Sequence, residues 1–148
     1  VVDWVTGACM MVRAEAAASV SGLDPAIFMY SEELDWCRRM SNAGWAVAYV
    51  PGAAVVHFEG RSSEQVATAR QVYFDASKVY YFRKHHGLLA AEVLRLSLLA
   101  GHLVALTGEA GKMALGHKIP LRRQRIAAYW HIVRSGSRGS RLRGRRDG

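Results

Sequence analysis

The sequence predicts an α/β fold followed by C-terminal helices. Three apolar runs with little charge have the pattern of extended strands: residues 2–13, 45–50 and 53–58. Five other stretches have the pattern of helices: residues 14–20, 31–43, 63–86, 88–106 and 118–134. Because the first two helices alternate with the strands, we expect strands and helices to share one core.

Glycine residues set the expected ends of these helices. Gly22 suits the position that follows a helix, Gly44 stops the second helix, and Gly87 breaks the long one. Gly108 and Gly111 are expected to end the apolar helix that comes next.

Composition indicates a globular chain with a basic tail. Of its 148 residues, 51% are hydrophobic and 22% are charged, so we expect one domain with a core. The net charge is +8, and it is unevenly distributed. Residues 1–111 hold nine basic and eleven acidic residues, whereas residues 112–148 hold eleven basic residues and one acid. From Ser135 onward, the sequence is rich in Ser, Gly and Arg, which predicts disorder.

The two cysteines and the N-terminal residues bear on the compartment. Cys9 and Cys37 lie in apolar contexts without metal-ligand spacing, so we expect buried free thiols in a reducing compartment. No signal peptide is recognisable, and the sequence opens on Val1 inside a strand-like run. We therefore expect a fragment of a longer protein.

The apolar helix over residues 88–106 is about as long as a membrane span. However, Glu92, Arg95 and His102 lie within it, and a charge at bilayer depth is costly. We therefore expect a packed or interfacial helix rather than a span.

Three carboxylates cluster at the start of the second predicted helix. Ser31 suits the N-cap, and Glu32 and Glu33 follow where the helix dipole favours anions. Apolar residues recur at three-residue spacing along this helix and would form a buried stripe that holds it in place. A carboxylate at the start of the helix could then stay exposed, as a general base requires. Ordinary capping chemistry explains the same acids without a catalytic role.

The segment Met29–Cys37 resembles the acidic motif of inverting family 2 glycosyltransferases of the GT-A fold, in the branch with rhamnosyltransferase-like enzymes. Further segments resemble the same family in the same order: Val5–Arg13, Gly22–Asp24, Asn42–Trp45, Tyr49–Pro51, Val55–Phe58, Gly60–Ser63 and Tyr81–Gly87. An ordered set of this kind is more specific than any single motif. It implies the C-terminal half of a GT-A domain, without the nucleotide-binding half.

The resemblance implies roles for individual residues. The family's catalytic base is the second acid of the pair, which here is Glu33, although many members have Asp at this position. Glu32 or Asp35 would orient the acceptor or brace the helix. Three residues of the first run would line the acceptor side: Trp4, Gly7 and Ala8.

The resemblance also implies a divalent cation, Mg²⁺ or Mn²⁺. In the family, a histidine at the position of His57 completes a site held by an Asp-x-Asp motif, which this sequence lacks. His57 would then be one ligand of an incomplete site, and a structural histidine is the alternative. Arg61, Ser62 and Ser63 would contact a diphosphate or an acceptor sugar, or else form a solvated loop with a helix cap.

These roles imply the transfer of a sugar from a nucleotide-sugar donor to a saccharide or lipid-linked acceptor, with inversion, in cell-wall or surface polysaccharide synthesis. Residues 1–87 would form the acceptor-side and catalytic portion, residues 88–134 a helical extension, and residues 135–148 a basic tail. We expect the isolated fragment to be inactive. Its expected location is the cytoplasm, at the inner face of the cell membrane.

A non-catalytic basic module is the alternative function. The arginine-rich residues 112–148 could bind nucleic acid or an anionic membrane surface. Glycine and serine separate many of the arginines, and few aromatic residues lie among them, which disfavours nucleic acid. The amphipathic helix beside them favours a membrane surface.

Overall fold

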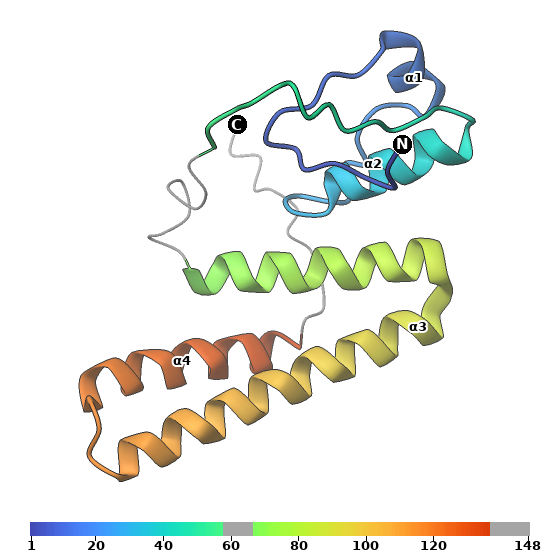
Figure 1. The fold of residues 1–148 in the computed structure, drawn as a ribbon. Coiled ribbons are helices and arrows are strands. Elements are labelled where there is room, and N and C mark those ends of the chain that lie inside the picture. Colours follow the sequence, from blue (N-terminus) through green and yellow to red (C-terminus); the bar gives the residue numbers. More distant parts are fainter. Residues whose placement is uncertain (58–66, 137–148) are drawn as a thin grey trace, which may run out of the picture. The chain divides into compact units, whose positions relative to one another are not determined.

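The computed structural model describes residues 1–57 and 67–136. It contains four helices over these residues: α1 (Ala14–Ser19), α2 (Glu32–Asn42), α3 (Ala67–Ala114) and α4 (Ile119–Ser135) (Figure 1). The chain forms two compact units, Val1–Glu64 and Gln65–Gly148, which we call unit 1 and unit 2. The sequence placed its functional boundary after residue 87, and that division of roles stays a prediction.

The predicted strands do not form within residues 1–57, so the α/β class is not confirmed there. The runs over 2–13 and 45–50, and residues 53–57 of the third run, contain no helix or strand. The Val2 N–H donates to the carbonyl of Val47 across 2.9 Å, but no further bond extends this pairing within the described residues. A strand becomes stable only when a ladder of such bonds satisfies its backbone.

The unpaired first run changes the environment of one cysteine. Cys37 on α2 is buried, as expected, but Cys9 is exposed, so the prediction of a second buried thiol is wrong. Both thiols are free. Cys9 lies on a segment that no sheet covers in the described part of unit 1, whereas Cys37 faces the apolar side of a helix.

The helices of unit 1 end where the sequence predicts. After α1, Gly22 has a φ of 72°, and its N–H donates to the carbonyl of Ala17 across 3.0 Å. After α2, Gly44 has a φ of 88°. Both conformations lie in the left-handed region that glycine adopts readily, so both predicted helix ends are confirmed.

A single arginine joins α2 to the turn after α1. Asp35 is completely buried, and its Oδ2 accepts from the Nε of Arg39 across 2.7 Å. The same guanidinium donates to the carbonyl of Gly22 across 2.7 Å and to the carbonyl of Val20. Because a buried carboxylate needs a charged partner, this contact fixes α2 against the turn.

Unit 2 is built from three helical segments. Helix α3 bends at Gly87, whose φ of 87° and ψ of 173° are not helical, and this confirms the predicted break. We call residues 67–86 the first arm of α3 and residues 88–114 the second arm. The second arm does not end at Gly108 or Gly111 as predicted, because it continues to Ala114 while α4 packs alongside it (Figure 1).

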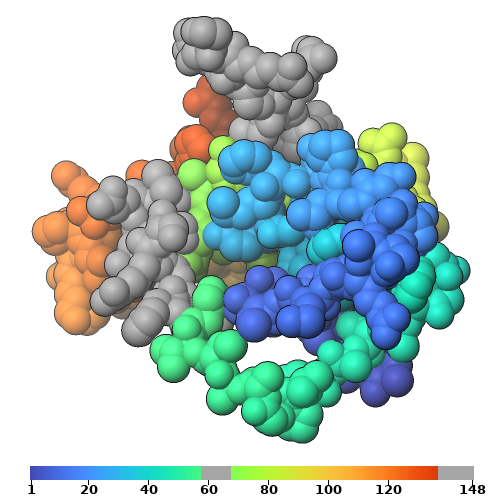
Figure 2. Space-filling model, turned by 90° about the horizontal axis from the view of Figure 1, so that it is seen from above, coloured from blue at the N-terminus to red at the C-terminus, as the bar shows by residue number. Residues whose placement is uncertain are grey.

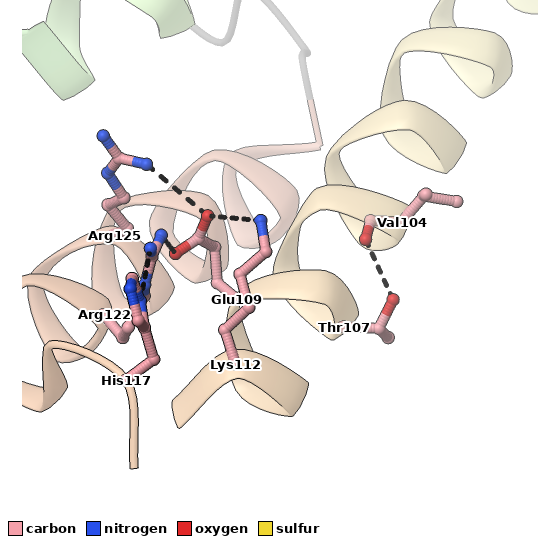
Figure 3. A network of polar contacts seen from close by, with 7 residues as sticks. All are labelled: Val104, Thr107, Glu109, Lys112, His117, Arg122 and Arg125. Carbon is pink, nitrogen blue, oxygen red and sulfur yellow. Dashed lines mark hydrogen bonds and ion pairs between the residues drawn. The ribbon is translucent and has the colours of Figure 1, made fainter. Parts of the chain in front are cut away.

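Buried polar contacts connect these segments. Glu109 on the second arm accepts from Arg122 on α4 across 2.6 Å, and Arg122 also contacts the Nδ1 of His117 across 3.1 Å (Figure 3). The hydrogen bond from Arg122 lowers the pKa of Glu109 below its ordinary value of 4.5. Asp75 on the first arm lies 2.7 Å from the Nε2 of His102 on the second arm. These polar groups are thus paired between the segments.

Removing the Arg39 side chain should destabilise unit 1. In Arg39→Ala, the buried carboxylate of Asp35 loses its ion pair, so we expect the free energy of unfolding to fall by about 3 kcal/mol. Urea unfolding of the chain, followed by tryptophan fluorescence, measures this change. The matched control is Arg13→Ala, which removes an exposed arginine of the same unit. Equal stability of the two variants would contradict the role given to Arg39.

Candidate functional site

The acidic motif follows two residues with left-handed backbone. Tyr30 and Ser31 have φ values of 67° and 69°, a conformation that is uncommon for residues other than glycine. Ser31 occupies the predicted N-cap position, but its side chain makes no capping bond; its carbonyl accepts from the N–H of Asp35 across 3.0 Å. Strained backbone of this kind is concentrated at functional sites, which makes the start of α2 the candidate site.

Glu33 lies near the glycine of the first run. A Cβ placed on Gly7 would lie 3.8 Å from the Cβ of Glu33 and 4.0 Å from its Cγ. The half-buried Glu33 side chain therefore lies beside the space that a side chain at position 7 would occupy. Trp4 and Ala8, on the same run, are exposed. The structure thus brings together the predicted base and one of the three residues predicted for the acceptor side.

Glu32 has a different environment. Its Oε2 atom is buried and has no hydrogen-bond partner among the described residues. Burial raises the pKa of this carboxyl above its ordinary value of 4.5, and the nearby charge of Glu33 adds to that effect, while a backbone hydrogen bond opposes it. The Nε1 of Trp36, one turn later on α2, is likewise buried without a partner in the described part of the chain. Such groups call for an explanation, and a ligand is one.

Asp35 lies inside unit 1. Its complete burial and its contact with Arg39 suit the bracing role, one of the two that the sequence left open for this residue. The signal was present in the sequence as the i, i+4 spacing of an acid and an arginine on one helix. Three neighbouring acids therefore occupy three environments: one pairs with arginine, one has an unpaired oxygen, and one covers Gly7.

The described residues do not complete a cation site. His57 is exposed, and no group of three or more His, Cys, Asp or Glu side chains suited to a metal occurs in residues 1–57 or 67–136. The residues present therefore do not fit a resident cation by themselves. Arg61, Ser62 and Ser63 lie outside the described residues, so their predicted contacts stay predictions.

Unit 1 also has an apolar hollow that the sequence analysis missed. It has a volume of about 980 Å³ and lies between residues of the three extended runs, with Ala16, Cys37 and Met40 also lining it. Figure 2 shows the opening between the blue residues of the first run and the green residues that precede position 58. None of the three clustered acids lines it, but Trp4 and Ala8 do, which are two of the three residues predicted for the acceptor side.

Comparison with known proteins identifies relatives of one kind. Residues 2–73 match the family model described as glycosyltransferase-like family 2. The chain is 34% identical over 108 residues to the N-acetylglucosaminyl-diphospho-decaprenol L-rhamnosyltransferase of Mycobacterium tuberculosis, covering 70% of this chain and 35% of that protein. It is 43% identical over 58 residues to the rhamnosyltransferase WbbL of Escherichia coli, covering 39% of this chain and 22% of that protein. No solved structure matches the chain.

Two consequences follow from the extent of these matches. The chain spans about a third of the length of the mycobacterial relative. The match to that relative is longer than unit 1, so it extends into the helices of unit 2.

Replacing Glu32 by its neutral isostere should stabilise the protein at neutral pH. Because the folded state raises the pKa of Glu32, the ionised form opposes folding above that pKa, and Glu32→Gln removes this opposition. We expect a higher melting temperature for the variant at pH 7. The gain should shrink as the pH falls through the raised pKa, since Glu32 is then protonated. Thermal unfolding across this pH range, with the exposed Glu15→Gln as control, measures the effect; a variant less stable than wild type at pH 7 would contradict it.

Proposed function

Because the chain belongs to glycosyltransferase-like family 2, we propose that it forms part of an enzyme that transfers a sugar from a nucleotide-sugar donor to the hydroxyl of a lipid-linked saccharide. Family membership implies the GT-A fold. The relatives from Mycobacterium tuberculosis and Escherichia coli are both named rhamnosyltransferases, which favours rhamnose as the sugar. The name of the first includes a diphospho-decaprenol, which favours a lipid-linked acceptor in polysaccharide synthesis.

One observation carries this proposal: within the matched residues, the structure holds Glu33 at the N-terminal end of α2, near Gly7. Transfer with inversion requires the acceptor hydroxyl to attack the anomeric carbon from the face opposite the diphosphate. In our proposal Glu33 takes the hydroxyl proton during this attack. The new bond joins the acceptor oxygen to the sugar, and the bond to the diphosphate breaks with its electron pair.

The neighbouring acids support this role in different ways. Asp35 and Arg39 hold α2 in position. Glu32 is the rival base, because its buried oxygen is unpaired among the described residues and its pKa is raised. In our proposal Glu32 instead accepts a hydrogen bond from the acceptor and orients it.

The proposal also includes a divalent cation, Mg²⁺ or Mn²⁺. His57 would be one of its ligands, and the other ligands would lie outside the described residues. The proton transfer to Glu33 does not depend on this cation.

The proposed location is the cytoplasm, at the membrane that carries a lipid-linked acceptor. Nucleic-acid binding relied on the basic residues 112–148, of which 137–148 lie outside the described residues, and no further observation favours it.

Substitution of Glu33 and Glu32 should separate the roles of the two acids. In the complete enzyme, Glu33→Gln should lower kcat for sugar transfer by at least about a hundredfold, because the base is lost, while donor binding stays intact. Glu32→Gln should mainly raise KM for the acceptor. If Glu32→Gln instead abolishes turnover and removes the acidic limb of the pH profile while Glu33→Gln stays active, Glu32 is the base.

The contact between Gly7 and Glu33 gives a steric test. An alanine Cβ at position 7 would meet Glu33 at an ordinary contact distance of 3.8 Å, so Gly7→Ala should retain most activity. The branched side chain of Gly7→Val adds atoms closer to Glu33 and should lower kcat by roughly tenfold to a hundredfold, since catalysis depends on placement of the base. Both variants are compared by initial rates in the complete enzyme; equal rates would show that the placement of Glu33 over Gly7 is immaterial.

A further inference from the structure

The second arm of α3 is apolar on its exposed side. Along residues 88–104, the large hydrophobic side chains exposed to solvent are all aliphatic: Leu88, Leu89, Val93, Leu96, Leu103 and Val104. We call these six residues the outer face. Only 6% of the most apolar window of α3 is buried, and its mean hydropathy is 1.7. A surface helix of a soluble domain normally has the opposite arrangement, with its polar side facing water.

The charges of this arm face the other helices or pair locally. His102 and Glu109 contact Asp75 and Arg122, which lie on the first arm and on α4. Arg95 is mostly buried and forms an ion pair with the half-exposed Glu92 across 2.6 Å. The second arm is therefore amphipathic with its apolar side facing solvent and most of its polar groups facing the protein.

The hydroxyl groups near the outer face are also satisfied internally. Ser97 donates to the carbonyl of Val93 across 2.9 Å. Figure 3 shows the bond from Thr107 to the carbonyl of Val104, which is also 2.9 Å long. A hydroxyl that bonds to its own helix can enter an apolar medium at lower cost. The charged and polar groups nearest the outer face, Glu92 included, thus already have partners within the helix.

Basic residues lie beyond both ends of the outer face. Arg83 and Lys84 are exposed just before Gly87, and Lys112 and Lys118 are exposed after the aliphatic residues end. Within the described residues, α4 adds exposed arginines and contains no acid. An apolar stripe with cations at both ends is complementary to the acyl chains and anionic headgroups of a lipid surface.

From this arrangement we propose that the outer face docks in the plane of an anionic lipid bilayer, without crossing it. A crossing is disfavoured because α4 packs along the second arm and would bring its arginines to bilayer depth. Docking in the plane buries the leucines between the headgroups and leaves α4 in water. This proposal does not depend on sugar transfer, but it would bring the protein to the surface that holds a lipid-linked acceptor.

Flotation of the full 148-residue chain with vesicles tests the proposal. The test variant replaces Leu89, Leu96 and Val104 by glutamine, and the matched control replaces the same three residues by methionine. We expect the wild type and the methionine variant to float with vesicles of phosphatidylcholine and phosphatidylglycerol, and to float less with phosphatidylcholine alone. The glutamine variant should lose at least about tenfold in partitioning, because its apolar area is reduced. Since the replaced side chains are exposed, circular dichroism should show unchanged helix content.

Three outcomes would overturn the proposal. The first is wild-type protein that fails to float with the anionic vesicles. The second is equal flotation of the glutamine and methionine variants, which would assign binding to the basic tail that both retain. The third is a wild-type dimer in size-exclusion chromatography that the glutamine variant dissociates without any difference in flotation, because a second copy would then cover the outer face.

Discussion

The buried ion pair between Asp35 and Arg39 determines how the candidate site is arranged. An isolated carboxylate inside a protein is costly, and the guanidinium of Arg39 stabilises the buried Asp35. Arg39 in turn donates to the carbonyls of Val20 and Gly22, which belong to the turn after α1. The rotation of α2 about its axis is thereby fixed. Glu33, two residues before Asp35, is then directed to the other side, where it meets Gly7.

Features that depend on local sequence could be predicted, and features that depend on distant partners could not. The helix ends at Gly22, Gly44 and Gly87 follow from the backbone freedom of one residue. The strands required neighbours that the described residues do not supply. Gly108 was expected to end a helix, but glycine costs only about 1 kcal/mol in a helix interior, and packing against α4 can outweigh that cost.

The candidate site shows the same division. The resemblance to a known family named Glu33 and Gly7 without any knowledge of their separation, and the structure places them close together. It could not distinguish the roles of Glu32 and Asp35, since these depend on burial. One of the two lies beside Arg39, and the other has an oxygen without a partner among the described residues. Glu32 and Asp35 are three residues apart, which puts them on one side of α2. Only the surrounding unit makes Asp35 a brace and leaves Glu32 available.

In unit 2, the orientation of the charges matters more than their number. Charged residues within an apolar helix argue against membrane contact only if they would face the lipid. Here His102 and Glu109 face their partners within the unit, so the same helix satisfies its polar groups and still exposes leucines. The arginines of α4 then limit how deeply unit 2 can enter the bilayer. These two constraints together favour a helix that lies at a lipid surface over one that spans it or one that is surrounded by water.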